Sequence, residues 1–312
     1  MVYNSKKFNI RYQAIFNSSS AKNTIKVWIV QPSTSIVQRI ENFSISHKPK
    51  KFYEDVQGNK ILYFEFKNQK NITIQMDIKA TLYKNKFDLD QERISLPNAS
   101  NQLSKQYTKS EKFLEQTPAI KNLTHQITSE NNSVLDKLQS ILNFIVKNFQ
   151  YHYPIKQRGV KHLNLKNLKG DCGEYSSLFV TMCRILKIPT RNNTGFVIYG
   201  DEINNIYEHG WTSVYLKPYG WIEIDPLANN IRKVEKKYIY ENNNYFLTFT
   251  KGFNLKIKPK IPKKFVFNYW EKIGLPITNT SVETLQPLIF ASKNKIKFSD
   301  NIKLISNIKS PN

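Results

Sequence analysis

The first 95 residues alternate apolar and polar positions, the pattern of strands that bury one face. β-branched and aromatic residues occupy most of the apolar positions, and Gly58-Asn59 provides a turn. Period-two alternation with these residue types is typical of half-buried strands. The segments concerned are 6–16, 24–29, 61–66 and 72–78. A series of such strands predicts an antiparallel β-sandwich. It has no cluster of acids, histidines or cysteines, so we expect a docking or spacer role.

Helical periodicity replaces the alternation further along the chain. Residues 133–149 repeat apolar positions at the three-and-four spacing of a helix with one buried face, and Ser133 and Asp136 form a capping pair at its start. Residues 97–132 are polar and mixed, and we expect only short helical pieces there, near Glu111–Leu114 and Ile120–Ile127.

A second helix follows the sequence Gly170-Asp171-Cys172. Apolar residues recur at helical spacing up to Leu186, and Pro189 ends the pattern, because the residue before a proline is disfavoured in the helical conformation. Cys172 therefore lies at or just before a helix N-terminus. Unpaired N–H groups and the helix dipole favour a thiolate there, which makes Cys172 a candidate nucleophile. Cys183 lies within the apolar stripe and is interpreted as core packing.

Strands return after this helix. The segments 195–200, 209–216 and 220–226 read as strands, the last two joined by the loop Lys217-Pro218-Tyr219. In the final third, Lys256–Pro262 alternates lysines with other residues, and its prolines confine it to an edge or irregular strand. The last dozen residues are expected to be loose.

The hairpin selects one of the five histidines as a base for the cysteine. If its midpoint lies near Lys217, Val214 faces Gly220, Thr212 faces Ile222, and His209 faces Asp225. Residues directly opposite in an antiparallel pair share a face, with Cβ atoms about 5 Å apart. Asp225 could then orient His209 towards Cys172, the logic of a nucleophile, base and orienter triad.

Each of these residues also has a purely structural interpretation. A lone buried cysteine is usually a small hydrophobe, a lone histidine at a strand start is usually structural, and an aspartate before a proline is most often a turn residue. The order of the three residues and the hairpin between two of them favour the catalytic interpretation.

Composition narrows the class of protein. The chain has 312 residues, 40% of them hydrophobic, and a net charge of +23, which indicates a globular protein. The charge admits nucleic-acid or anionic-surface binding, but the basic residues are spread along the whole length, so we favour compositional drift and expect no specific nucleic-acid partner. No stretch approaches the roughly 20 apolar residues of a membrane helix.

The spacing of the two cysteines and the sequence of the N-terminus are used to predict the cellular compartment. Cys172 and Cys183 fall on one predicted helix roughly 16 Å apart, too far to bridge. The N-terminus has no apolar run after its charges. We therefore expect no signal peptide and a reducing, cytoplasmic location.

Several motifs together resemble the transglutaminase-like superfamily over residues 133–228. The matching residues are Gly170-Asp171-Cys172, Ile188-Pro189-Thr190-Arg191, His209-x-Trp211 and Gly220–Pro226. The N-terminal module also resembles the β domain that precedes the catalytic domain in bacterial and archaeal members. There the matching residues are Val27-Trp28-Ile29-x-Gln31-Pro32, Gln38 and Asp55-x-x-Gly58-Asn59. One departure is Ser213, where many members carry an acid.

The resemblance implies an α+β, papain-like cysteine proteinase core and a triad of Cys172, His209 and Asp225. The reaction would be acyl transfer from protein or peptide amides through a thioester, with hydrolysis expected more often than cross-linking to an amine. The oxyanion would be held by the Cys172 N–H and by Tyr151 or Tyr153, a choice that stays open. The implied enzyme needs no cofactor or metal, and no calcium loop is visible in the sequence.

Two other functions stay open at this point: an inactive transglutaminase fold that serves as an interaction module, and a basic anionic-surface binder. The expected organisation is a β-sandwich at 1–95, a partly helical linker at 96–132, a catalytic domain at 133–260 and a β or irregular C-terminal extension at 261–312. The sequence leaves the substrate and the oligomeric state undetermined.

Overall fold

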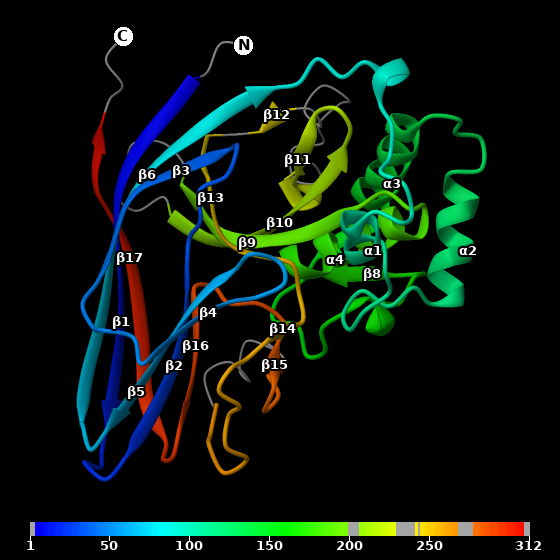
Figure 1. Cartoon of the computed structure of the whole chain (residues 1–312). Helices are drawn as coiled ribbons and strands as arrows, with labels where there is room; N and C mark the ends of the chain where they lie inside the picture. Colours follow the sequence, from blue (N-terminus) through cyan, green and yellow to red (C-terminus); the bar gives the residue numbers. More distant parts are fainter. Residues whose placement is uncertain (1–3, 199–205, 229–240, 243, 268–276, 309–312) are drawn as a thin grey trace. The chain divides into compact units, whose positions relative to one another are not determined.

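The computed structural model describes residues 4–198, 206–228, 241–242, 244–267 and 277–308 (Figure 1). These residues form two compact units. The first combines the chain up to residue 85 with 194–209 and 243–312, and the second combines 86–193 with 210–242. The long strands β9 (Thr190–Ile198) and β10 (Ile206–Leu216) contribute residues to both units.

The first unit is built from strands. They are β1 (Asn4–Ser18), β2 (Thr24–Gln31), β3 (Gln38–Ile45), β4 (Lys51–Glu54), β5 (Lys60–Lys67), β6 (Asn71–Lys86), β13 (Phe246–Lys251), β14 (Leu255–Lys256), β15 (Ser281–Val282), β16 (Leu288–Ser292) and β17 (Ile296–Ile308). Four of them, β1, β2, β5 and β6, correspond to the four segments whose alternation predicted strands.

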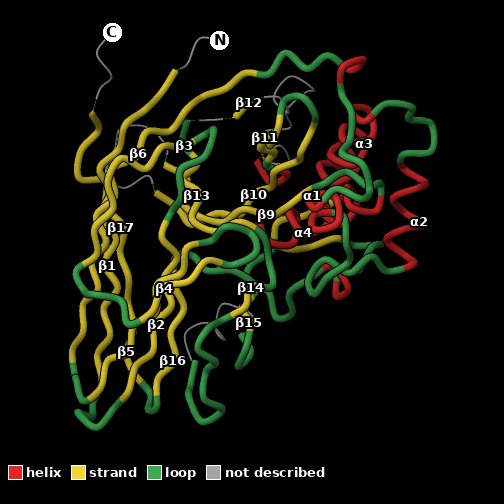
Figure 2. Tube along the Cα trace, in the orientation of Figure 1, coloured by secondary structure: helices red, strands yellow, loops and turns green. Residues whose placement is uncertain are grey.

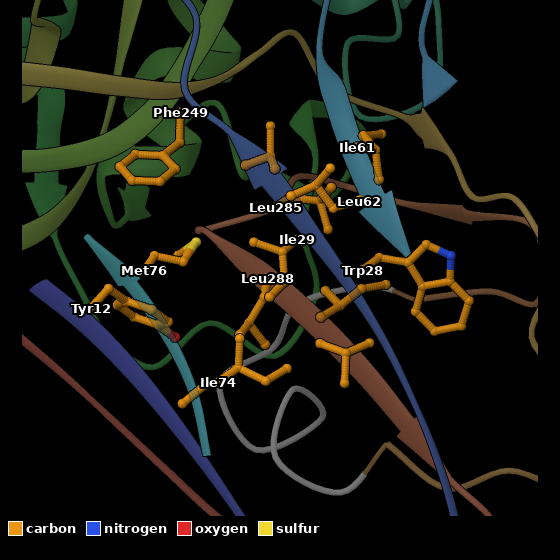
Figure 3. Packing of buried hydrophobic residues seen from close by; sticks show 14 of the residues in the cluster. Tyr12, Trp28, Ile29, Ile61, Leu62, Ile74, Met76, Phe249, Leu285 and Leu288 are labelled. Carbon is orange, nitrogen blue, oxygen red and sulfur yellow. The ribbon is translucent and has the colours of Figure 1, made fainter. Parts of the chain in front are cut away.

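Two antiparallel sheets share the core of this unit. One contains β3, β6, β1 and β17 in that order, and the other contains β16, β2, β5 and β4. Ile29 of β2 pairs with Leu288 of β16, and both lie in one buried cluster with Tyr12, Ile74 and Met76 of the other sheet (Figure 3). The predicted sandwich is therefore present.

The C-terminal residues complete both sheets. β17 pairs with β1 from Lys7 to Ser18, and β16 pairs with β2. The expectation of a loose C-terminus is wrong for 301–308, because these residues belong to β17. Their lysines and asparagines weaken the apolar signal, as is common on an edge strand. The predicted boundaries at residues 95, 132 and 260 stay predictions.

Two polar residues of the N-terminal motifs hold the backbone of β13. The amide of Gln38 donates to the Thr248 carbonyl oxygen over 2.9 Å and accepts from the Thr248 N–H over 2.7 Å. The amide of Asn59 bonds the N–H and carbonyl of Lys251 in the same two-point manner. Both side chains are buried, so these residues satisfy backbone groups where water has no access.

The second unit contains the helices (Figure 2). Its elements are η1 (Gln91–Arg93), α1 (Gln102–Tyr107), α2 (Pro118–Ile127), α3 (Val134–Asn148), β7 (Phe149–Tyr151), η2 (Val160–His162), β8 (Leu168–Gly170), α4 (Cys172–Ile185), β11 (Gly220–Ile224) and β12 (Glu241–Asn242). Strands β11, β10, β9 and β13 form one sheet in that order.

The core of the second unit joins α3, α4 and the hairpin of β10 and β11. Ile141 of α3, Phe179 of α4 and Ile222 of β11 are among its buried residues. The predicted helix at 133–149 is confirmed, and Ser133 caps it by accepting from the Asp136 N–H over 3.0 Å. Within the described ranges, no helix is long and apolar enough to cross a membrane.

The linker differs from its prediction at one of two places. The helical piece near Ile120–Ile127 is confirmed as α2. The piece at Glu111–Leu114 is wrong: these residues form a tight turn in which the Leu114 N–H donates to the Glu111 carbonyl over 2.9 Å. Phe113 has a φ of 75° there, which no helix accommodates. A helix occurs instead at α1.

Candidate active site

Cys172 is the first residue of α4, as the sequence predicted. Asp171 is the N-cap, and its Oδ1 accepts from the Gly173 N–H over 2.8 Å. Cys172 is partly exposed. A cysteine in this position lies beside the unpaired N–H groups of the helix N-terminus.

An arginine joins the acids on both sides of Cys172. Arg158 lies in the loop before η2, and its Nη1 donates to Asp171 Oδ1 over 2.5 Å and to Glu174 Oε2 over 2.6 Å, while its Nη2 donates to Asp171 Oδ2 over 2.7 Å. The side chains of Arg158, Asp171 and Glu174 are only 10%, 7% and 2% exposed. Burial opposes ionisation of Asp171, but the hydrogen bonds and charge of Arg158 outweigh it and lower the pKa of this carboxyl.

Two glycines make room for this cluster. A Cβ at Gly170 would collide with the side chain of Glu174, and a Cβ at Gly173 would lie 3.0 Å from Arg158 Nη1. Gly170 and Gly173 of the sequence Gly-Asp-Cys-Gly-Glu are therefore required sterically, in addition to the proposed role of the cysteine between them. Arg158 was not among the residues that the sequence indicated. The two acids that flank Cys172, Asp171 and Glu174, were the available sign that a cation lies nearby.

Cys183 has a different environment on the same helix. It is fully buried in the apolar cluster of the second unit, and this burial raises the pKa of its thiol. A thiol held protonated is a poor nucleophile, which supports the interpretation of Cys183 as core packing.

Strand β10 meets α4 one turn after Cys172. The Ser176 hydroxyl donates to the carbonyl oxygen of Gly210 over 3.3 Å. His209 is the preceding residue of the same strand and is half-buried. Its carbonyl oxygen accepts from the Gln286 amide over 3.1 Å, and its ring lies 6.3 Å from that of Phe246, centroid to centroid.

The hairpin register differs from its prediction by two residues. Val214 pairs with Ile222 and Thr212 with Ile224, so the expected pairings of Val214 with Gly220, Thr212 with Ile222 and His209 with Asp225 are wrong. The loop of Lys217, Pro218 and Tyr219 is centred on Pro218 rather than Lys217, and Gly220 follows it with a φ of 84°, as in hairpins that carry a bulge after a three-residue loop.

Asp225 lies one residue beyond the end of β11, where the backbone turns into a short helical segment. Its Oδ1 accepts from the Ala228 N–H over 3.0 Å, and the residue is 7% exposed. A shift of two residues keeps every side chain on its original face. Asp225 thus remains on the side of the hairpin that the sequence assigned to it, and the register of β10 and β11, which begins at Thr212 and Ile224, does not pair it with His209.

Alternation places Trp211, Ser213 and Glu223 on the same hairpin face as His209 and Asp225, and these three side chains are buried. Trp211 Nε1–H donates to Glu223 Oε1 over 3.2 Å, and Ser213, the departure from the family pattern, accepts from the Asn193 amide over 2.6 Å. Burial raises the pKa of Glu223 to about 7, although the Trp211 hydrogen bond and the charge of Arg191 oppose this. Arg191 itself stacks on Trp221, its Cζ 3.9 Å from the ring centroid.

Among the residues that the structure describes, no group of three His, Cys, Asp or Glu side chains could hold a metal ion.

Comparison with known families gives a match over the residues that include Cys172, His209 and Asp225. The family model described as the transglutaminase-like superfamily matches residues 121–226. No protein with a curated description matches the sequence.

Solved structures resemble the chain at low sequence identity. A candidate cysteine protease from Cytophaga hutchinsonii is 14% identical, with a TM-score of 0.61 over 99% of this chain and 95% of that one. The periplasmic domain of TgpA from Pseudomonas aeruginosa is also 14% identical, with a TM-score of 0.39 over 72% of this chain and 71% of that one. The first likeness confirms the mixed α and β fold of a transglutaminase-like cysteine protease. Residues 121–226 of this chain are therefore a transglutaminase-like domain.

Proposed function

We propose that the protein catalyses cysteine-dependent acyl transfer on protein or peptide amides, with hydrolysis as its reaction. Cys172 is the nucleophile, His209 is the general base and Asp225 orients the imidazole. The Cys172 thiolate attacks the amide carbonyl, and the C–N bond breaks as His209 protonates the leaving amine. Water activated by His209 then attacks the thioester carbonyl, releasing the acid and the free thiol.

The position of Cys172 is the observation that carries this proposal. It is a partly exposed cysteine at the first position of a capped helix, within a domain of the transglutaminase-like superfamily. The N–H groups of the first helical turn have no intrahelical partner, so that of Cys172 is suited to bind the oxyanion of the tetrahedral intermediate.

Two further contacts support the partners of the nucleophile. The Ser176–Gly210 hydrogen bond fixes β10 to α4 one turn from Cys172, and His209 is covalently next to Gly210. The Ala228 N–H holds the carboxylate of Asp225 at the end of β11. These positions suit His209 as the base and Asp225 as the orienter of a triad.

An activated ester tests the proposal without knowledge of the natural substrate. Incubation with p-nitrophenyl acetate should give one equivalent of acetyl adduct, which peptide mapping by mass spectrometry places on Cys172. Adding an amine then separates the two fates of the acyl group: hydrolysis leaves the amine unmodified, and cross-linking acetylates it. Acetylation that proceeds equally well in Cys172→Ala would contradict the nucleophile assignment.

A further inference from the structure

Arg158 joins the two residues that enclose Cys172 and Gly173 in the chain. Its Nη1 and Nη2 donate to the two carboxylate oxygens of Asp171, and Nη1 also donates to Glu174 Oε2 over 2.6 Å. Asp171 Oδ1 accepts at the same time from the Gly173 N–H over 2.8 Å. The peptide groups between Asp171 and Glu174, which include the Cys172 N–H, are therefore held at both ends by one guanidinium group.

The guanidinium group packs directly against the first turn of α4. The side chains of Arg158 and Glu174 are both buried. A Cβ at Gly173 would lie 3.0 Å from Arg158 Nη1 and 3.2 Å from Asp171 Oδ1, so the arginine and the cap lie in contact with this turn. Side chains locked by packing and by several hydrogen bonds hold the groups beside them in one geometry.

The linker in turn holds the loop that carries Arg158. Gly159 approaches the backbone of Phe113 so closely that a Cβ on the glycine would lie 2.9 Å from Phe113 Cα. The Val160 N–H donates to the Phe113 carbonyl over 3.1 Å, and Val160 is buried. The tight turn at 111–114 therefore fixes the position from which Arg158 reaches α4.

A second buried arginine joins the other end of α4 to the same linker. Arg184 Nη1 donates to Glu111 Oε1 over 2.6 Å and to the Lys109 carbonyl over 3.1 Å, and Nε donates to the Thr190 carbonyl over 2.9 Å. Arg184 resembles Arg158 in burial and in its ion pair with a carboxylate. It lies about three turns from the start of the helix, so it provides a matched control.

We propose that Arg158 is a positioning residue that holds the Cys172 N–H in the orientation that binds the oxyanion during acyl transfer. The inference rests on the proposed function, because an oxyanion forms only when Cys172 attacks a carbonyl carbon. Arg158 acts through Asp171 and Glu174 rather than on the substrate. A displacement of about 1 Å at a catalytic group can cost about 10²-fold in rate, and loss of one oxyanion donor has a similar effect.

Two reagents for the same thiol separate oxyanion binding from the reactivity of the sulfur. With p-nitrophenyl acetate, Cys172 adds to the carbonyl carbon, and the resulting oxyanion collapses with loss of p-nitrophenolate. With iodoacetamide, the sulfur displaces iodide at a saturated carbon and no oxyanion forms. Arg158→Met should therefore slow acylation about 10²-fold and leave alkylation at the parental rate. Peptide mapping of Cys172 gives both rates.

Two further variants separate positioning from stability. Arg158→Met with Asp171→Asn and Glu174→Gln leaves no buried carboxylate without its cation, so it should be more stable than Arg158→Met alone. It should still acylate slowly, because methionine cannot join residues 171 and 174, and it provides the test if Arg158→Met does not fold. Arg158→Lys should recover part of the acylation rate, because an ammonium group reaches a carboxylate but cannot make the two-point contact.

The matched control breaks the ion pair at the other end of the helix. Arg184→Met with Glu111→Gln should keep the parental ratio of acylation to alkylation. All rates are measured where Cys183 stays unmodified, which shows that the core is folded.

Three results would overturn the positioning role of Arg158. They are an equal change of both rates in Arg158→Met, parental acylation in the triple variant, and a ratio in the Arg184 control that falls as far as in Arg158→Met. The proposed function itself would fail on a different result, the absence of acetylation at Cys172 in the parent protein.

Discussion

The two cysteines of α4 differ in everything except their helix. Cys172 is partly exposed at the first helical position, and three buried charged groups surround its backbone. Cys183 lies about three turns further along, fully buried among apolar side chains. One end of the helix therefore leaves its thiol accessible, whereas the interior shields the other thiol and raises its pKa. Two residues of the same type thus lie in different environments on one helix.

Removing each thiol should produce the largest contrast. Cys172→Ala should reduce acyl-enzyme formation with p-nitrophenyl acetate by at least about 10³-fold, because the nucleophile is lost. Cys183→Ala should retain the parent rate and lose about 1 kcal/mol of unfolding free energy, since a small cavity forms in the core. Burst kinetics and urea unfolding measure the two effects. A burst of parental size in Cys172→Ala would contradict the assignment of Cys172 as the nucleophile.

The proposed partners of Cys172 should have the next largest effect. Asp225→Ala and His209→Ala are each expected to lower the acylation rate by about 10²- to 10⁴-fold, as loss of a triad member does. For Asp225 part of the change could be structural, because its carboxylate also caps the turn at Ala228. Asp225→Asn preserves an oxygen for this cap, so it should keep the unfolding free energy and still lose activity. Unchanged turnover in Asp225→Asn would remove Asp225 from the mechanism.

The charge cluster around Cys172 should govern the stability of this end of the helix. Arg158→Ala leaves Asp171 and Glu174 buried without their cation and should cost about 3–5 kcal/mol of unfolding free energy. Arg158→Lys should recover only part of this, because an ammonium cannot reproduce the two-point contact with Asp171.

A triple variant controls for the charges that Arg158→Ala leaves behind. Arg158→Met with Asp171→Asn and Glu174→Gln removes all three charges and should lose less stability than Arg158→Ala alone. Urea denaturation compares the variants, and a parent-like Arg158→Ala would show that the cluster does not hold the start of α4.

A smaller effect is expected from Glu223 of β11, whose side chain is buried. Its pKa rises from an ordinary 4.5 to about 7 on folding, so the unfolded chain ionises first as the pH increases. This residue's contribution to stability is therefore present below pH 4.5 and is lost as the pH rises to about 7. Glu223→Gln should flatten this part of the profile of unfolding free energy against pH. Glu92→Gln, at an exposed glutamate, is the control, and an equal flattening there would contradict the assignment.

The elements that the sequence predicted correctly are those whose signal is local. The 3.6-residue period identified α3 and α4, and the start of the second pattern placed Cys172 at or just before a helix start. Strand alternation likewise identified β1, β2, β5 and β6. Each pattern reports which face of an element is buried, and that is decided within a few turns of chain.

The features that escaped prediction were set by pairings and contacts that a periodic pattern does not record. The pairing of β17 with β1 joins the two ends of the sequence, and no local sequence pattern identifies a strand partner at that distance. The hairpin register failed by two residues because loop geometry, rather than the apolar pattern, fixes the centre of the turn. Arg158 was missed because a loop arginine shows no periodicity, and only the folded chain brings it to Asp171 and Glu174.

Competition between the two thiols for one reagent is the sharpest test of whether Cys172 is the reactive cysteine. The folded protein is treated with less than one equivalent of iodoacetamide at neutral pH, quenched and mapped by mass spectrometry. We expect almost all carbamidomethyl groups on Cys172, and we expect Cys183 to react only after urea unfolds the chain. Equal modification of both cysteines in the folded protein, or preferential modification of Cys183, would contradict this expectation.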